Sequence, residues 1–141
     1  MCANKNISVF YSRFSPFRKI HLYLTKLLKS DFVEVDGHKM YLDSLDTMRL
    51  SFYGIHEPFE TEILKKEIKE GDVVLDIGAN IGYYTLIFAK LVGNNGKVYA
   101  FEPDPESFRL LSKNVEINGY KNIILIKKAV SDKSGKTKLF I

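Results

Sequence analysis

The residues best suited to chemistry lie in a glycine-containing loop and at two acidic positions on either side of it. An apolar run ends at Asp76, and the loop Gly78–Gly82 follows with Asn80 at its centre. Glu102 comes about 20 residues after the loop. Glycine reaches backbone angles that other residues avoid and places no Cβ between the chain and a ligand, and asparagine tolerates the left-handed region. The pattern indicates a nucleotide-binding crevice; the alternative is a tight connection between a strand and a helix, without a ligand.

A strand–helix–strand unit is needed to bring these groups together, and the sequence provides one. The run Val73–Ile77 predicts a buried parallel strand, the spacing of apolar residues from Tyr84 to Leu91 predicts a helix, and Val98–Phe101 predicts the next strand. Such a connection between parallel strands is right-handed, so Glu102 is expected beside the glycine loop. A carboxylate there can accept hydrogen bonds from two ribose hydroxyls; the alternative is an exposed acid at the end of a strand.

The loop does not match the fingerprint of dinucleotide-binding sites. Laid from Gly78, the pattern G-x-G-x-x-G requires glycine where this chain has Asn80 and Tyr83. A pyrophosphate needs close approach of the backbone and a bare helix N-terminus, whereas a ligand with one ribose and no phosphate does not. The residues therefore favour an adenosine without phosphates, such as S-adenosylmethionine. A nicotinamide-dependent oxidoreductase is the alternative enzyme class.

Two longer segments around these residues resemble a known family. Val74–Thr85 and Ala100–Pro105 are similar to the FkbM family of S-adenosylmethionine-dependent methyltransferases. The similarity extends forward through Leu111–Asn114 and Asn118–Gly119 to Ala129–Asp132, and more weakly back to Gly54–Pro58. The resemblance implies an α/β fold, namely the Rossmann-like parallel sheet of class I methyltransferases with helices on both faces. It also implies methyl transfer from S-adenosylmethionine to a hydroxyl oxygen of a sugar, glycan or small-molecule natural product.

The resemblance also implies where the cofactor would bind. The loop with Gly78, Asn80 and Gly82 would lie beneath the methionine part of the cofactor, and Asp76 would face its amino group. Glu102 would hold the ribose hydroxyls. The remaining positions surround the adenine ring, with Pro103 packed near it and Ala129 and Val130 on its other side.

Glu57 precedes a predicted helix and has two interpretations. It is a weak candidate for a contact with the cofactor or the acceptor, and equally it can cap the helix that follows. No catalytic base is assigned. No metal site is expected, because His21, His38 and His56 lack the spacing of metal ligands.

The first 30 residues predict a basic helical arm, separate from a methyltransferase domain over residues 31–141. Ser15 and Pro16 are suited to open a helix, and every charged residue before Asp31 is positive. The apolar stripe of this helix either covers the core of the domain or contacts an anionic membrane surface. The stripe comprises Phe17, Ile20, Leu24, Leu27 and Leu28.

Several further elements can be predicted along the rest of the chain. Asp36 and Gly37 indicate the turn of a β-hairpin, a short helix is expected over Asp46–Tyr53, and Asp104 is suited to cap a helix that ends near Gly119. Apolar residues indicate the buried faces of two other helices and one interior strand, and a last strand is expected from Lys136. The residues of the two helix faces are Phe59, Ile63, Leu64 and Ile68, and Tyr84, Ile87, Phe88 and Leu91; the interior strand is Ile123–Ile126.

Composition describes an ordinary globular protein of 141 residues, with 45% hydrophobic and 27% charged residues and a net charge of +4. The single cysteine, Cys2, fits a reducing cytoplasm. No RNA-binding module is recognisable, so no nucleic-acid partner is expected. A class I sheet has seven strands, so the resemblance implies the N-terminal part of such a domain, with an unpaired sheet edge that invites self-association. A non-catalytic cofactor-binding fragment is therefore an alternative to an enzyme.

Overall fold

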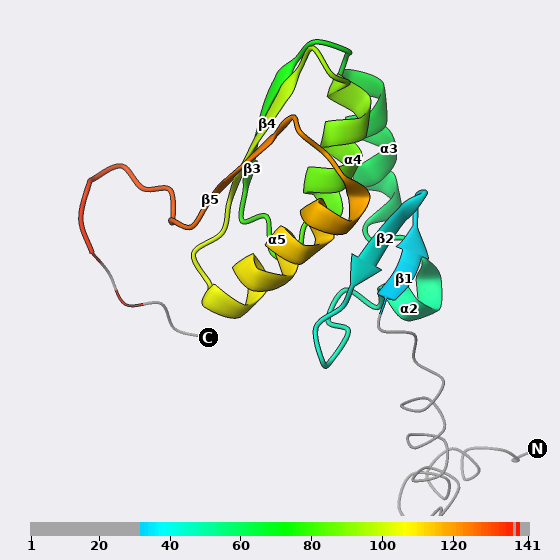
Figure 1. Cartoon of the computed structure of the whole chain (residues 1–141), viewed down its shortest axis with the longest axis horizontal. Helices are drawn as coiled ribbons and strands as arrows, with labels where there is room; N and C mark the ends of the chain where they lie inside the picture. The colour runs from blue at the N-terminus through cyan, green and yellow to red at the C-terminus, as the bar shows by residue number, and fades with distance from the viewer. Residues whose placement is uncertain (1–31, 137, 139–141) are drawn as a thin grey trace, which may run out of the picture. The chain divides into compact units, whose positions relative to one another are not determined.

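The computed structural model describes residues 32–136 and Lys138, all within the unit Asp31–Ile141 (Figure 1). The arm predicted over residues 1–30 lies outside the described residues and stays a prediction. In the described part, no helix is both long and apolar enough to cross a membrane.

The first element is the predicted β-hairpin, formed by β1 (Phe32–Val35) and antiparallel β2 (His38–Tyr41). Asp36 and Gly37 form its turn with φ angles of 51° and 79°. Positive φ at both central residues is what a primed two-residue turn requires. The Asp-Gly pair thus determines the register of the hairpin.

The main sheet consists of three parallel strands, β3 (Val73–Ile77), β4 (Lys97–Phe101) and β5 (Ile123–Ile126), in the order β3-β4-β5. Asp76 near the end of β3 lies opposite Ala100 of β4. The parallel Rossmann-like sheet confirms the predicted fold class. β5, expected in the interior, instead lies at an edge of the sheet formed by the described residues.

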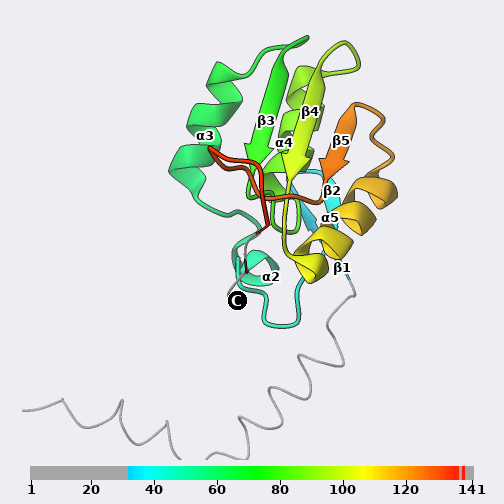
Figure 2. The same cartoon turned by 90° about the vertical axis from the view of Figure 1, so that its left-hand side faces the viewer.

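Two helices connect these strands, α4 (Tyr83–Val92) and α5 (Pro105–Asn118). Figure 1 shows both on the same side of the sheet, with the hairpin beyond them. Two right-handed crossovers that proceed in the same direction along a sheet must place their helices on one face. The expectation of helices on both faces is therefore wrong for the described elements. Figure 2 shows the opposite face toward the viewer; its exposed side chains include Val73, Leu75 and Ile77.

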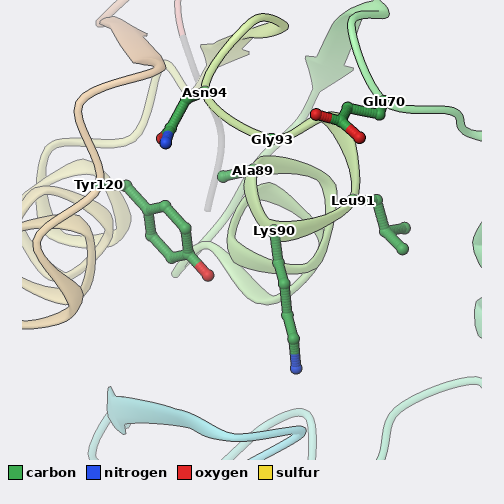
Figure 3. A pocket seen from close by; sticks show the side chains of 7 residues that line it. All are labelled: Glu70, Ala89, Lys90, Leu91, Gly93, Asn94 and Tyr120. Carbon is green, nitrogen blue, oxygen red and sulfur yellow. The ribbon is translucent and has the colours of Figure 1, made fainter.

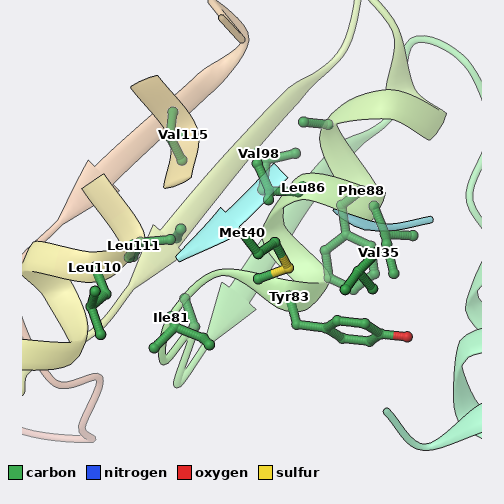
Figure 4. Close-up of a cluster of buried hydrophobic side chains, with 14 of the residues drawn as sticks. Val35, Met40, Ile81, Tyr83, Leu86, Phe88, Val98, Leu110, Leu111 and Val115 are labelled. Atoms are coloured by element: carbon green, nitrogen blue, oxygen red, sulfur yellow. The ribbon is translucent and has the colours of Figure 1, made fainter. Parts of the chain in front are cut away.

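Helix α4 is buried on more sides than the single apolar face predicted for it, which comprised Tyr84, Ile87, Phe88 and Leu91. Tyr84 and Leu91 are only partly buried, whereas Tyr83 and Leu86 are almost fully buried (Figure 4). The reason is that α4 packs on the sheet with one side while Met40 of the hairpin belongs to the same hydrophobic core. A single apolar stripe describes a helix with one solvated face, and α4 is covered from two directions.

Helix α3 (Pro58–Glu67) also differs from its predicted orientation. Phe59 is 73% exposed and Ile63 is 43% exposed, while Thr61 is 1% exposed. The Thr61 hydroxyl lies 3.2 Å from the Tyr83 hydroxyl. A polar contact between α3 and α4 therefore orients the helix, and hydrophobic periodicity could not reveal it.

Helix α2 occupies only Leu50–Tyr53 of the predicted helix over Asp46–Tyr53. Both Asp46 and Arg49 have positive φ, which breaks the helical path, and the Asp46 carboxylate accepts a backbone N–H at the start of α2. Gly54 follows with a φ of 65° and ends the helix after Tyr53, which is where the predicted helix ends.

Helix α5 begins and ends as predicted. The Asp104 carboxylate accepts a hydrogen bond from the N–H of Ser107 at 2.7 Å, and Gly119 follows the last turn with a φ of 73°. These caps fix α5 directly after Glu102, so the second acid of the site is held between a strand and a helix.

Candidate cofactor site

The loop after β3 adopts the backbone conformation that its sequence predicts. Gly78, Asn80 and Gly82 all have positive φ, at 84°, 49° and 95°. The N–H groups of Gly78 and Ala79 both donate to the carbonyl of Phe101 at 2.9 Å. The loop is therefore tied to the carboxyl end of β4, where the second acidic residue follows.

The two glycines of the loop have different surroundings. A Cβ at Gly78 would meet no protein atom within 4 Å, whereas a Cβ at Gly82 would lie 2.7 Å from Leu111 Cδ1. Packing of α5 therefore accounts for Gly82 without a ligand. Gly78 borders open space beside the strand end, which is the kind of backbone surface that a ligand can approach closely.

Glu102 lies beside this loop, as the strand–helix–strand unit predicts. The residue is 7% exposed, which excludes the alternative of a solvated acid at a strand end. One carboxylate oxygen accepts the N–H of Asn80 and the other accepts the N–H of Asp104, each at 2.8 Å. A carboxylate offers about four acceptor sites, so both oxygens retain capacity for further donors such as vicinal hydroxyls.

Asp76 adds a second buried carboxylate to the same edge of the sheet. The hydroxyl of Thr85 donates to it. Burial raises the pKa of the Asp76 carboxyl above its ordinary value of 3.8, the Thr85 hydrogen bond opposes this, and nearby Glu102 raises the pKa further. Two neighbouring acids favour a ligand with positive charge over a pyrophosphate. The ammonium and sulfonium groups of S-adenosylmethionine fit this requirement.

We expect Asp76→Asn to raise thermal stability at neutral pH, because asparagine keeps an oxygen for Thr85 and removes a buried charge. An acid whose folded-state pKa is raised favours folding below its unfolded pKa and disfavours it as pH rises further. The melting temperature of the variant should exceed that of the unaltered chain by about 2–5 °C at pH 8, and the gap should shrink toward pH 4. Thermal melts across this range measure it, and a gap independent of pH would contradict the role of the buried charge.

Glu57 does not cap α3, so that interpretation is wrong. It has a φ of 45° at the N-cap position and makes no side-chain cap. Its carboxylate accepts a hydrogen bond from the Tyr84 hydroxyl at 2.8 Å and lies 3.6 Å from His56 Nε2. Burial and the bond to Glu57 raise the pKa of Tyr84 to about 12, so this phenol remains a donor at neutral pH. Through Tyr84, Glu57 is connected to the first turn of α4.

The residues expected around an adenine ring lie less close together than the glycine loop, Asp76 and Glu102 do. Pro103 is half-buried and directly follows Glu102, but β5 ends at Ile126, before Ala129 and Val130. Both residues lie in an exposed segment after the strand. Their contact with an adenine ring stays a prediction.

Two cavities lie away from the acidic pair. One, of about 410 Å³, is near the C-terminal end of α4 (Figure 3); its lining includes Glu70, Lys90 and Tyr120. The other, of about 420 Å³, adjoins Glu57 and includes Arg49 and His56 in its lining. Sequence reasoning missed the second cavity, because it is formed by irregular segments without periodicity. Among the described residues, no group of three His, Cys, Asp or Glu side chains could hold a metal ion.

The chain resembles methyltransferases in sequence. The model of the TRM5/TYW2 methyltransferase domain family matches residues 33–138. The protein-L-isoaspartate O-methyltransferase of Methanococcoides burtonii is 42% identical over 60 residues, which are 43% of this chain and 30% of that protein. The probable cobalt-precorrin-6B C(15)-methyltransferase (decarboxylating) of Saccharolobus solfataricus is 44% identical over 64 residues, 45% of this chain and 32% of that protein. The chain thus spans about a third of the length of these relatives.

Solved structures agree with this assignment of the fold. TYW2 of M. jannaschii in complex with AdoMet superposes with a TM-score of 0.55 at 28% identity, over 67% of this chain and 41% of that one. Trm5b of Pyrococcus abyssi superposes with a TM-score of 0.52 at 24% identity, over 67% of this chain and 27% of that one, which supports the fold alone.

The predicted membership of the FkbM family is wrong, because the matching family model is that of TRM5/TYW2. The resemblance depended on the loop Gly78–Gly82 and on Glu102. These residues suit binding of the cofactor, which methyltransferases with different acceptors share. They therefore indicated the class of enzyme correctly and its family incorrectly.

Proposed function

The chain belongs to the TRM5/TYW2 methyltransferase domain family, and from this we propose that it binds S-adenosylmethionine and takes part in methyl transfer to tRNA. The family acts on tRNA. The predictions that excluded a nucleic-acid partner and assigned a small-molecule or glycan hydroxyl as acceptor are therefore wrong. The first was drawn from the lack of a recognisable RNA-binding module. The second was drawn from a family resemblance carried by the residues around the glycine loop, which would contact the cofactor and not the acceptor.

The observation that carries the proposal is Glu102 beside the glycine loop, with one backbone N–H bound to each carboxylate oxygen. These bonds hold the carboxylate in one orientation, and its remaining acceptor sites would bind two ribose hydroxyls. Gly78 would allow the cofactor to approach the backbone, and the negative charge of Asp76 would attract its ammonium group. S-adenosylmethionine supplies a methyl group on a positively charged sulfur. The role of these residues is to hold it in one orientation, which is a large part of the rate enhancement in a two-substrate reaction.

The charge of the C-terminal part of the described chain supports an RNA acceptor. Residues 105–138 contain eight Lys or Arg and three Asp or Glu. The ammonium of Lys113 lies 3.4 Å from the ring centroid of Tyr41, and that of Lys127 lies 5.8 Å from the ring centroid of Phe108. Lysines neutralise phosphates, and these contacts hold two of the lysines in defined positions on the surface.

We expect Lys127→Glu to weaken tRNA binding and to reduce the dependence of that binding on salt. Loss of one phosphate contact lowers the slope of log K against log salt by about 1. Lys97→Glu is the matched control. Lys97 is also exposed, but it lies at the amino end of β4, whereas Glu102 follows the carboxyl end of the same strand. Filter binding with a tRNA transcript at several salt concentrations measures both. Equal losses in the two variants would contradict a defined RNA surface near Lys127.

The proposal is tested by titrating the chain with S-adenosylmethionine in a calorimeter and then incubating it with methyl-labelled cofactor and unmodified tRNA. Saturable binding of the cofactor and label in the RNA are the expected results. Absence of cofactor binding would contradict the site. Label in added protein, with none in tRNA, would contradict the acceptor.

A further inference from the structure

A buried asparagine in α5 connects the cofactor loop to the hairpin. Asn114 is 0% exposed. Its side-chain oxygen accepts the N–H of Tyr41 at 2.6 Å, and its side-chain nitrogen donates to the carbonyls of Tyr41 at 3.1 Å and Ile81 at 2.7 Å. One amide therefore pairs with the edge of β2 and with the loop at the same time.

A second asparagine one turn later provides an internal comparison. The oxygen of Asn118 accepts the N–H of Lys39 at 3.0 Å, and its nitrogen donates to the carbonyl of Lys39 at 2.7 Å. Together, Asn114 and Asn118 bind alternate residues of β2 as a neighbouring strand would. The two side chains differ in one respect that matters for the site, since Asn114 also donates to the loop.

The contact at Ile81 is placed where the loop is most sensitive. The preceding residue, Asn80, has a φ of 49° and donates its N–H to Glu102. The following residue, Gly82, packs so closely on Leu111 of α5 that a Cβ would lie 2.7 Å from it. A non-glycine residue with positive φ persists only when its surroundings hold it there. Helix α5 therefore holds the loop at Ile81 and at Gly82, directly after Asn80.

We propose that Asn114 is a positioning residue for cofactor binding. By fixing the Ile81 carbonyl, it keeps the N–H of Asn80 directed at Glu102 and so orients the carboxylate before the cofactor arrives. Because the same side chain binds Tyr41, docking of the hairpin and occupancy of the site stabilise each other, as linkage requires. This inference rests on the proposed binding of S-adenosylmethionine.

The test compares Asn114→Ala with Asn118→Ala by calorimetry with S-adenosylmethionine and by thermal melts. Both variants lose two hydrogen bonds to the hairpin and should melt at lower temperature. Only Asn114→Ala also leaves the Ile81 carbonyl unpaired, so its dissociation constant should rise about tenfold to a hundredfold, a range consistent with an unpaired buried acceptor. Asn118→Ala should change the constant less than about threefold. Equal weakening in both variants would overturn the proposal.

Hydrogen exchange in the unaltered chain decides the matter if Asn114→Ala does not fold. On addition of S-adenosylmethionine, exchange of the Tyr41 N–H should slow about tenfold more than exchange of the Lys39 N–H, because only the former binds Asn114. Equal slowing of the two would overturn the proposal. Failure of the unaltered chain to bind the cofactor would instead overturn the proposed function, and this inference with it.

Discussion

Glu102→Ala is expected to weaken the binding of S-adenosylmethionine by about 2–4 kcal/mol, because hydrogen bonds to a charged group contribute about 1.5–3 kcal/mol each and are not fully additive. The effect has two sources. The variant loses the acceptor for the ribose hydroxyls, and it also leaves the N–H groups of Asn80 and Asp104 without their partner. Calorimetric titration of the folded variant measures the change.

Glu106→Ala is the matched control for this experiment. Glu106 lies in the first turn of α5, and its exposed carboxylate forms an ion pair with Arg109. The control removes one negative charge near the site without touching the loop. Equal affinity in Glu102→Ala and the unaltered chain would rule out the ribose contact, and an equal loss in both variants would point to a general charge effect.

Gly78→Val is expected to abolish detectable cofactor binding. At a φ of 84°, any side chain is strained, and a branched one would project into the open space that the ligand needs. Gly71→Val is the matched control, because Gly71 has a φ of 88° and a Cβ there would also meet nothing within 4 Å. Gly71 lies before the amino end of β3, whereas Gly78 follows its carboxyl end. Both variants should melt at lower temperature, and only Gly78→Val should lose binding. An unchanged dissociation constant in Gly78→Val would mean that the loop is only a connector.

The arrangement of the candidate cofactor site could be predicted from the sequence because its parts are local and chemically distinctive. Asp76, the glycine loop and Glu102 lie within one strand–helix–strand unit, whose handedness is fixed by general rules. The sequence therefore predicted that Glu102 would lie beside the glycine loop. The observed hydrogen bond from Asn80 to Glu102 confirms that meeting.

The elements that were predicted wrongly depend on contacts between distant segments. Phe59 was assigned to a buried face because it is apolar, but the bond between Thr61 and Tyr83 turns α3 the other way. No role was predicted for Asn114, since an asparagine in a helix is ordinarily a solvated residue. The acceptor was missed for a related reason, because the motif describes only the cofactor side of the enzyme.

The separation along the chain of the contacts described above has a consequence for the order of folding. The bond between Asn80 and Glu102 in the candidate cofactor site joins residues 22 positions apart, whereas the bonds that dock the hairpin on α5 and Tyr120 join residues 73 to 82 positions apart. Closing a longer loop costs more chain entropy and slows the formation of the contacts that depend on it. We therefore expect the strand–helix–strand unit to form first, with the glycine loop in contact with Glu102, and the hairpin to dock on α5 afterwards. On gentle heating the hairpin should detach from α5 before the contact between the glycine loop and Glu102 is lost. The domain would therefore unfold in steps, and the candidate site would lose the support of the hairpin first.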